Sequence, residues 1–86
     1  MNRIFDKYKN IKKRHSDRIV LVHAGGCYTT FDNDAEKIHE ICNIPLHKAK
    51  NEFKAYEKFA YFVTPSLYSF LTKMIVNGHR ICTTDI

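Results

Sequence analysis

Basic side chains fall into two groups whose spacing suits contact with an anionic partner. The first lies near the start of the chain and consists of Lys9, Lys12, Lys13 and Arg14. The second lies further along and consists of Lys48, Lys50, Lys54 and Lys58. Such cations bind phosphates without reading base sequence, and the interleaved rings of Phe53 and Tyr56 can stack on bases. Duplex DNA is therefore a candidate partner.

The net charge of +5 is concentrated at one end of the sequence. Residues 1–18 hold seven basic and two acidic residues, whereas residues 19–86 hold seven of each. Such asymmetry can indicate an anionic partner, such as nucleic acid. The alternative is that the cations form the solvated face of an amphipathic helix, and that Phe53 and Tyr56 anchor a loop to the core.

Histidine and cysteine residues offer two further kinds of chemistry. His39, Cys42 and His47 are zinc-binding residue types, but a closed zinc site needs four ligands, so we expect no metal or other cofactor. Cys27 and His23 stand across a predicted hairpin in the manner of a nucleophile and its base. No third residue is present to orient the pair, so we expect no enzymatic activity. The three cysteines fit reduced thiols in the cytoplasm.

The elements that position these residues follow from apolar periodicity and turn signals. The chain of 86 residues is expected to form one domain, 1–86, of mixed α/β class in the order α-β-β-α-β-β-α-β. Helices are predicted at 3–14, 33–42 and 65–76. Strands are predicted at 18–23, 27–31, 44–48, 59–63 and 79–83. No apolar run is long enough to span a membrane.

Local signals fix several boundaries. The Gly25-Gly26 pair predicts a tight hairpin, because primed turns need positive φ angles. Asn33 and Glu36 have the spacing of a capping box, and Thr64 is a good N-cap before Pro65. Asn77-Gly78 predicts a left-handed helix end.

Helix stripes and strand patterns predict which side chains form the core. The last helix should bury the stripe formed by Leu67, Phe70, Leu71, Met74 and Ile75. The apolar run 19–22 suggests an interior strand covered on both faces, and Pro45 suggests that the strand at 44–48 lies at an edge.

Several segments resemble, in order, the N-terminal domain I of the MutS mismatch-repair family. The matching segments are 8–17 (YKNIKKRHSD), 25–31 (GGCYTTF), 33–35 (NDA), 44–48 (IPLHK) and 66–78 (SLYSFLTKMIVNG). The resemblance implies a mixed sheet with packed helices. It also implies that Cys27 and Thr29 occupy the positions of the family's Phe-x-Glu mismatch probe, whose side chains share one strand face.

Both probe residues differ here, and this decides the expected function. Cys27 is too small to wedge into a base stack, and Thr29 lacks a carboxylate. No G-x-x-x-x-G-K-[ST] segment occurs in the sequence, so we expect no ATP binding. We therefore expect a DNA-binding accessory module related to mismatch repair.

The alternative function is protein interaction or homo-oligomer assembly through an edge strand at 44–48 or 79–83. The family's domain I continues beyond the position that matches Ile86, which suggests that a final strand is supplied by a partner subunit.

Overall fold

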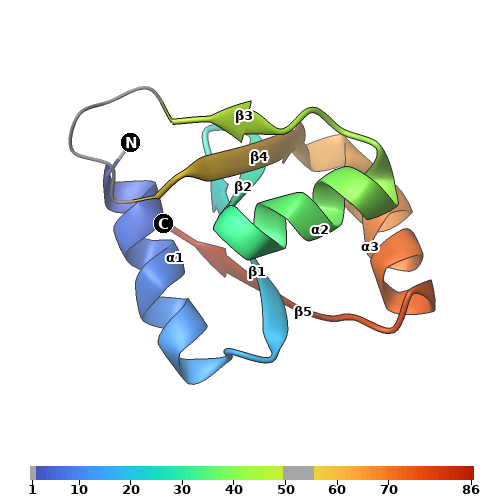
Figure 1. Ribbon diagram of the computed structural model, residues 1–86, viewed down its shortest axis with the longest axis horizontal. Helices are drawn as coiled ribbons and strands as arrows, with labels where there is room; N and C mark the ends of the chain where they lie inside the picture. The colour runs from blue at the N-terminus through green and yellow to red at the C-terminus, as the bar shows by residue number, and fades with distance from the viewer. Residues whose placement is uncertain (1, 50–55) are drawn as a thin grey trace.

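Three helices and five strands form within the part of the chain that the computed structural model describes, residues 2–49 and 56–86 (Figure 1). The helices are α1 (Asn2–Arg14), α2 (Asp32–Cys42) and α3 (Leu67–Val76), with a 3₁₀ turn, η1 (Thr64–Ser66), before α3. The strands are β1 (Arg18–Ala24), β2 (Cys27–Phe31), β3 (His47–Lys48), β4 (Lys58–Val63) and β5 (Arg80–Asp85). The predicted fold class and element order are confirmed.

The strands form one mixed sheet in the order β3-β4-β2-β1-β5. β1 pairs with β5 in parallel, and the other neighbouring strands are antiparallel. β1 is thus an interior strand, as predicted. Its successive side chains alternate between two hydrophobic clusters, with Ile19 and Leu21 in one and Val20 and Val22 in the other.

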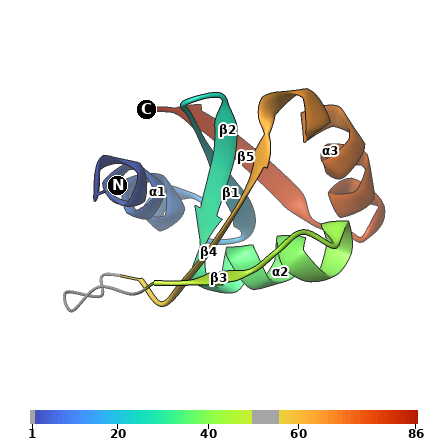
Figure 2. The same cartoon turned by 90° about the horizontal axis from the view of Figure 1, so that it is seen from above.

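The helices cover the two faces of the sheet unequally. Figure 2 shows α1 alone on one face and α2 with α3 on the other. On the α1 face, the aromatic rings of Phe5 and Tyr8 pack against Phe31 with centroid distances of 5.1 and 5.2 Å. These contacts fix α1 across the start of β1 and the end of β2.

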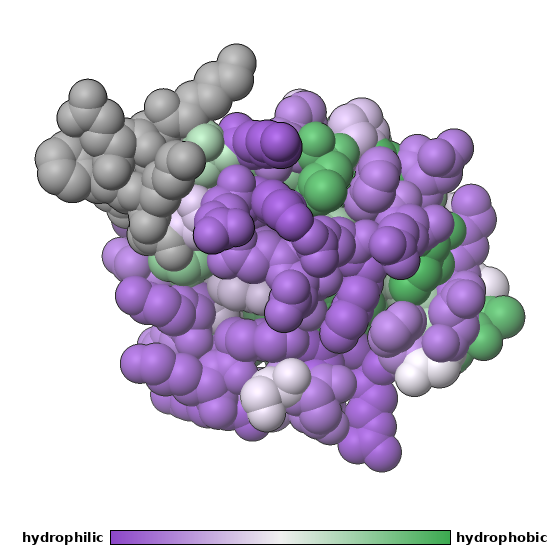
Figure 3. Space-filling model, viewed as in Figure 1, coloured by the Kyte–Doolittle hydropathy of each residue, from purple (hydrophilic) through white to green (hydrophobic). Residues whose placement is uncertain are grey.

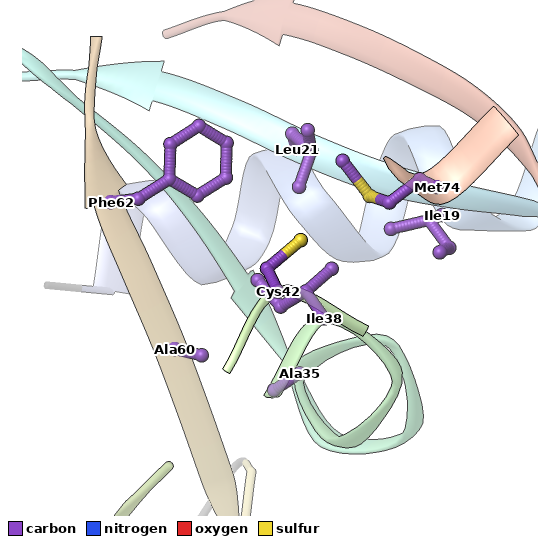
Figure 4. Close-up of a cluster of buried hydrophobic side chains, with 8 residues drawn as sticks. All are labelled: Ile19, Leu21, Ala35, Ile38, Cys42, Ala60, Phe62 and Met74. Carbon is purple, nitrogen blue, oxygen red and sulfur yellow. The ribbon is translucent and has the colours of Figure 1, made fainter. Parts of the chain in front are cut away.

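The other face holds the larger aliphatic core. In Figure 4, Leu21, Ile38, Met74 and Phe62 point toward one another from β1, α2, α3 and β4. Complete burial of such a side chain contributes about 1.5–3 kcal/mol. The predicted stripe of α3 is confirmed except for Ile75, which is 61% exposed. That side chain lies on the flank of the helix, and no described element covers it.

Two glycine signals adopt the predicted geometry. Gly25 and Gly26 have φ angles of 59° and 78°, as a primed hairpin turn requires. At the end of α3, Gly78 has a φ of 84° and its N–H donates to the carbonyl of Ile75. The N–H of His79 reaches the carbonyl of Met74, which completes a Schellman motif.

Both predicted N-caps are wrong, because their side chains bond elsewhere. The capping box of Asn33 and Glu36 is absent: α2 begins at Asp32, and Glu36 instead pairs with Lys58. Thr64 caps no helix, since its hydroxyl lies 3.0 Å from His23 Nε2.

β1 and β4 each differ from the predicted range by one residue, and β3 and β5 differ by more. The strand predicted at 44–48 covers only His47–Lys48, because Pro45 has no N–H to donate and Ile44 packs on the core. The final strand covers Arg80–Asp85, since His79 belongs to the helix end.

Candidate nucleic-acid interface

The two probe positions lie on a sheet face that is partly open to solvent. In the ladder between β2 and β4, Cys27 pairs with Val63 and Thr29 pairs with Tyr61. Paired residues of an antiparallel ladder project to the same side, so all four share one face. Val63 is 54% exposed and Tyr61 is 46% exposed. We call Cys27, Thr29, Tyr61 and Val63 the β2–β4 face.

Aromatic rings extend this face toward the edge of the sheet. The ring of Tyr61 lies 5.3 Å from that of His47 on β3, with an interplanar angle of 13°. Phe59 is stacked at 5.0 Å from His47 and at 6.4 Å from Tyr61. Because the three rings are nearly parallel and held by neighbouring strands, the exposed ring of Tyr61 has few conformations to lose on binding.

Helix α1 borders the same side of the sheet. Phe31, on the same side of β2 as Cys27 and Thr29, lies beneath Phe5 and Tyr8. Three of the four predicted cations on α1 are exposed: Lys9, Lys13 and Arg14. The ammonium group of Lys9 lies 5.5 Å from the ring centre of Phe5, which limits its range of positions. The fold therefore brings these cations and the probe positions to one side of the sheet.

Lys12, the fourth predicted cation on α1, has a different environment. Its Nζ lies 3.0 Å from the carboxylate of Asp34, whose side chain is 1% exposed, and it donates to the carbonyl of Arg18. A lysine held in this way by a buried carboxylate is not available to a phosphate. The sequence pattern places Lys12 beside Lys13 on the polar side of the helix, and gives no sign of a partner 22 positions away.

Lys48 does not join this surface in the described structure. Lys48 pairs with Lys58 at the start of β4. Because side chains alternate along β4, Lys58 shares the side of Ala60 and Phe62, which is the α2 side of the sheet. Lys50 lies outside the described residues.

Of the two aromatic residues predicted for base stacking, Tyr56 is not part of this surface. Tyr56 is 5% exposed and packs against Phe5 and Phe31, so it cannot stack on a base. Phe53 and Lys54 lie outside the described residues. Tyr61, by contrast, was not predicted. Its segment, KFAYFV, is apolar on both faces. Sequence alone does not reveal that the face carrying Tyr61 and Val63 is exposed to solvent.

The suggested Cys27–His23 pair does not form. His23 is opposite Tyr28, while Cys27 is opposite Ala24, so the two side chains project from opposite sides of the hairpin. His23 is held by other partners: its Nδ1 lies 2.9 Å from Asp85, and its ring stacks on Tyr28. This geometry offers no base to the thiol of Cys27.

The histidines and cysteines considered for metal binding are dispersed. Nδ1 of His39 lies 2.6 Å from the carbonyl of Ile44, while Cys42 is buried in the core. Residues 2–49 and 56–86 contain no group of three or more metal-ligand side chains. In the same residues, no helix has the length and apolar character needed to cross a bilayer.

Comparison with known proteins places the whole described fold in one family. The family model for MutS domain I matches residues 2–85. The chain is 33% identical over 79 residues to the DNA mismatch repair protein MutS of Porphyromonas gingivalis, and 33% identical over 82 residues to that of Christiangramia forsetii. These matches cover 92% and 95% of this chain but 9% of each relative. A third relative, MutS of Salinibacter ruber, is 33% identical over 79 residues. The chain therefore belongs to the MutS domain I family.

Proposed function

We propose that this domain binds duplex DNA as an accessory module related to mismatch repair. One observation carries the proposal: the register of β2 and β4 joins both probe positions to an exposed tyrosine and valine, beside the cations of α1. Membership of the MutS domain I family supports the same partner. The proposed role is binding, with no catalytic step.

The cations of α1 supply the affinity in this proposal. Lys9, Lys13 and Arg14 contact phosphates, and these contacts orient the duplex without reading its bases. Lys12 is omitted from the interface, because Asp34 holds it. If the three exposed cations each release one counterion, the logarithm of affinity falls with the logarithm of salt concentration with a slope of about −2.7.

The β2–β4 face supplies the contacts with the bases. Thr29 can donate or accept a hydrogen bond at a base edge, and Tyr61 and Val63 offer apolar contact. Cys27 is too small to replace a base in the stack, and no carboxylate stands at Thr29 to accept a bond from a displaced base. We therefore propose that the module binds matched and mismatched duplexes with similar affinity.

A fluorescence anisotropy titration tests this proposal. Matched duplex, duplex with one G·T mismatch and single-stranded DNA are titrated between about 50 and about 200 mM salt. The slope above corresponds to an affinity loss of about 40-fold over this range for the matched duplex. Replacement of Lys9, Lys13 and Arg14 by glutamate should abolish most of the binding and of its salt dependence.

The matched control is Lys37→Glu, which reverses an exposed charge on α2, on the other side of the sheet. It should leave affinity within about twofold of the unsubstituted chain, because charges more than about 10 Å away are screened. Absence of binding at low salt, or equal loss in the control and the triple variant, would contradict the proposal. A clear preference for the mismatched duplex would contradict the part that concerns the probe.

A further inference from the structure

A group of stacked rings on β3 and β4 ends at an exposed side of Tyr61. The ring of His47 lies 5.3 Å from that of Tyr61 and the ring of Phe59 lies 6.4 Å from it, with interplanar angles of 13° and 15°. Since His47 and Phe59 are themselves only 5.0 Å apart, both lie in nearly the same direction from Tyr61. They therefore cover one side of its ring and leave the other side open. Tyr61 is 46% exposed, so solvent reaches the open side.

The open side of Tyr61 faces along β4 toward Val63. Phe59 precedes Tyr61 by two positions and Val63 follows it by two, so the three side chains project from the same side of the strand. Side chains two positions apart on a strand are separated by about 6.8 Å, which is twice the spacing of stacked bases, about 3.4 Å. A planar base therefore fits between the ring of Tyr61 and the side chain of Val63.

The neighbouring strand leaves room beside this space. Thr29 is opposite Tyr61 and Cys27 is opposite Val63, and both side chains are small. The hydroxyl of Thr29 can donate a hydrogen bond to the edge of a base or accept one from it. On the far side of Thr29, Val22 of β1 is fully buried in the cluster beneath α1, so the helix bounds the open patch there. The patch is two strands wide, which suits one base and not a base pair.

The one-sided exposure of Tyr61 determines which bases it can stack on. A side chain that wedges into a duplex must present a face to the base on each side of it. Because His47 and Phe59 cover one side of the ring, Tyr61 can stack only on a base that ends a stack. Bases within an intact duplex have neighbours on both faces, whereas an unpaired base offers a free face at no cost of unpairing.

We propose that Tyr61, held in place by His47 and Phe59, stacks on the first unpaired base at the point where a duplex continues as a single strand. This inference rests on the proposed DNA binding and narrows its ligand to duplex with a single-stranded extension. The cations of α1 hold the phosphates of the duplex, and Tyr61 adds the preference for the extension.

Charge on the same side of the sheet favours a nucleotide as the ligand of this ring. Contacts between rings continue from Phe59 through Tyr56 to Phe5, at centroid distances of 6.2 and 4.9 Å. The ammonium group of Lys9 lies 5.5 Å from the centre of the Phe5 ring. The continuous row of rings thus has a cation at one end and the exposed Tyr61 at the other. An apolar peptide would leave this cation unmatched, whereas nucleic acid brings phosphates together with its bases.

Fluorescence anisotropy with matched DNA probes tests the proposal. One probe is a blunt duplex, and two others carry a short run of unpaired adenines at the 3′ or the 5′ end. The unsubstituted chain should bind one of the extended probes about tenfold more tightly than the blunt duplex, because stacking of a single base contributes about this much. An extension of abasic nucleotides, which has the same phosphates but no bases, should not produce this gain.

Variants of Tyr61 assign the gain to its ring. Tyr61→Ala should remove the preference for the extended probe and have a smaller effect on the blunt duplex, whereas Tyr61→Phe should retain the preference because the ring is kept. Fluorescence of 2-aminopurine at the first unpaired position should fall when the unsubstituted chain or Tyr61→Phe binds, but not when Tyr61→Ala binds. Circular dichroism confirms that each variant is folded.

Tyr68→Ala is the matched control, because it removes a tyrosine that is 81% exposed on α3, on the other side of the sheet. Figure 3 shows hydrophobic side chains reaching the surface at the α3 side of the molecule, in green at the right. This variant should keep the full preference for the extended probe. Loss of the preference in Tyr68→Ala would overturn the assignment to Tyr61.

The remaining outcomes separate this inference from the proposed function. Equal affinity for the blunt and extended duplexes would overturn the inference and leave the proposed function standing. A gain that persists with the abasic extension or in Tyr61→Ala would overturn it in the same way. Binding of the extended probes without binding of the blunt duplex would contradict the proposed function and support the stacking site. Absence of binding to every probe would overturn both.

Discussion

The ammonium group of Lys12 lies 3.0 Å from the buried carboxylate of Asp34, so the last turn of α1 is fastened to the first turn of α2. The carboxylate also accepts hydrogen bonds from the hydroxyl of Tyr8 at 2.9 Å and from the N–H of Val20 at 3.2 Å. One side chain thus joins two helices and the central strand. Because each oxygen is satisfied, a full charge can be accommodated where the side chain is 1% exposed.

Removal of the lysine should destabilise the domain. Lys12→Met leaves the carboxylate of Asp34 buried with two neutral donors, and we expect a loss of about 3 kcal/mol in the free energy of unfolding. Urea denaturation at neutral pH measures it. Lys13→Met, one position along the same helix but exposed, should change stability by less than about 0.5 kcal/mol. Equal effects of the two substitutions would mean that the ion pair contributes nothing.

Tyr8 should make the domain sensitive to alkaline pH. Burial raises the pKa of its hydroxyl far above the ordinary value of 10.0, and the charge of Asp34 raises it further. Below about pH 10 the hydroxyl is protonated in both the folded and the unfolded chain, so its contribution to stability is complete. Above that pH only the unfolded chain loses the proton, and stability falls by about 1.4 kcal/mol per pH unit on account of Tyr8.

Tyr8→Phe separates this effect from the titration of other groups. The variant should be about 1 kcal/mol less stable at neutral pH, because a hydrogen bond is lost. Its stability should fall less steeply above pH 10 than that of the unsubstituted chain, as measured by urea denaturation at several pH values. Identical slopes in the two proteins would show that another group governs alkaline unfolding.

Substitutions at the two glycines of the hairpin turn should have different effects on stability. Gly26 has a φ of 78°, which an alanine side chain adopts only with strain, so Gly26→Ala should cost about 1 kcal/mol. Gly25→Asn should be neutral or slightly stabilising, because Asn-Gly is the preferred pair in this turn and asparagine restricts the unfolded chain. Thermal unfolding should show a drop of about 4–8 °C for the alanine variant alone. Equal melting temperatures would contradict the assigned turn.

Restoration of the family's probe should confer mismatch preference if the β2–β4 face binds DNA. Cys27→Phe combined with Thr29→Glu places a ring and a carboxylate on the side that carries Tyr61 and Val63. We expect the ratio of mismatched to matched affinity to rise about tenfold, or about 1.4 kcal/mol. Tyr28→Phe, on the opposite side of the strand, should leave the ratio unchanged. An unchanged ratio in the double variant would argue against a role of this face in base contact.

Most elements of the fold were predictable because their signals are local. The apolar run 19–22, the Gly25-Gly26 turn and the Asn77-Gly78 helix end each depend on neighbouring residues, and each has the expected conformation. The errors lie where a distant partner competes with a local one. Thr64 was expected to cap a helix, but its hydroxyl bonds to His23, 41 positions earlier.

The candidate site was predictable only in part, for the same reason. Periodicity places Lys9, Lys12 and Lys13 together on the polar side of α1, and only the packing of α2 separates Lys12 from the other two. Likewise, the exposure of Tyr61 depends on which strand pairs with β2 and on how far α1 extends over the sheet. Neither can be predicted from a short segment of sequence.

The parallel pairing of β1 with β5 bears on how the domain folds during its synthesis. The two strands come from segments that lie 62 positions apart in the sequence, as the pairing of His23 with Asp85 shows. A nascent polypeptide that has emerged only through α3 has the hairpin but not the strand that closes one side of β1, and Ile81 is missing from the core. Stable folding on the ribosome must therefore wait until β5 has left the exit tunnel, and pauses in translation before that point would prolong exposure of the apolar sheet.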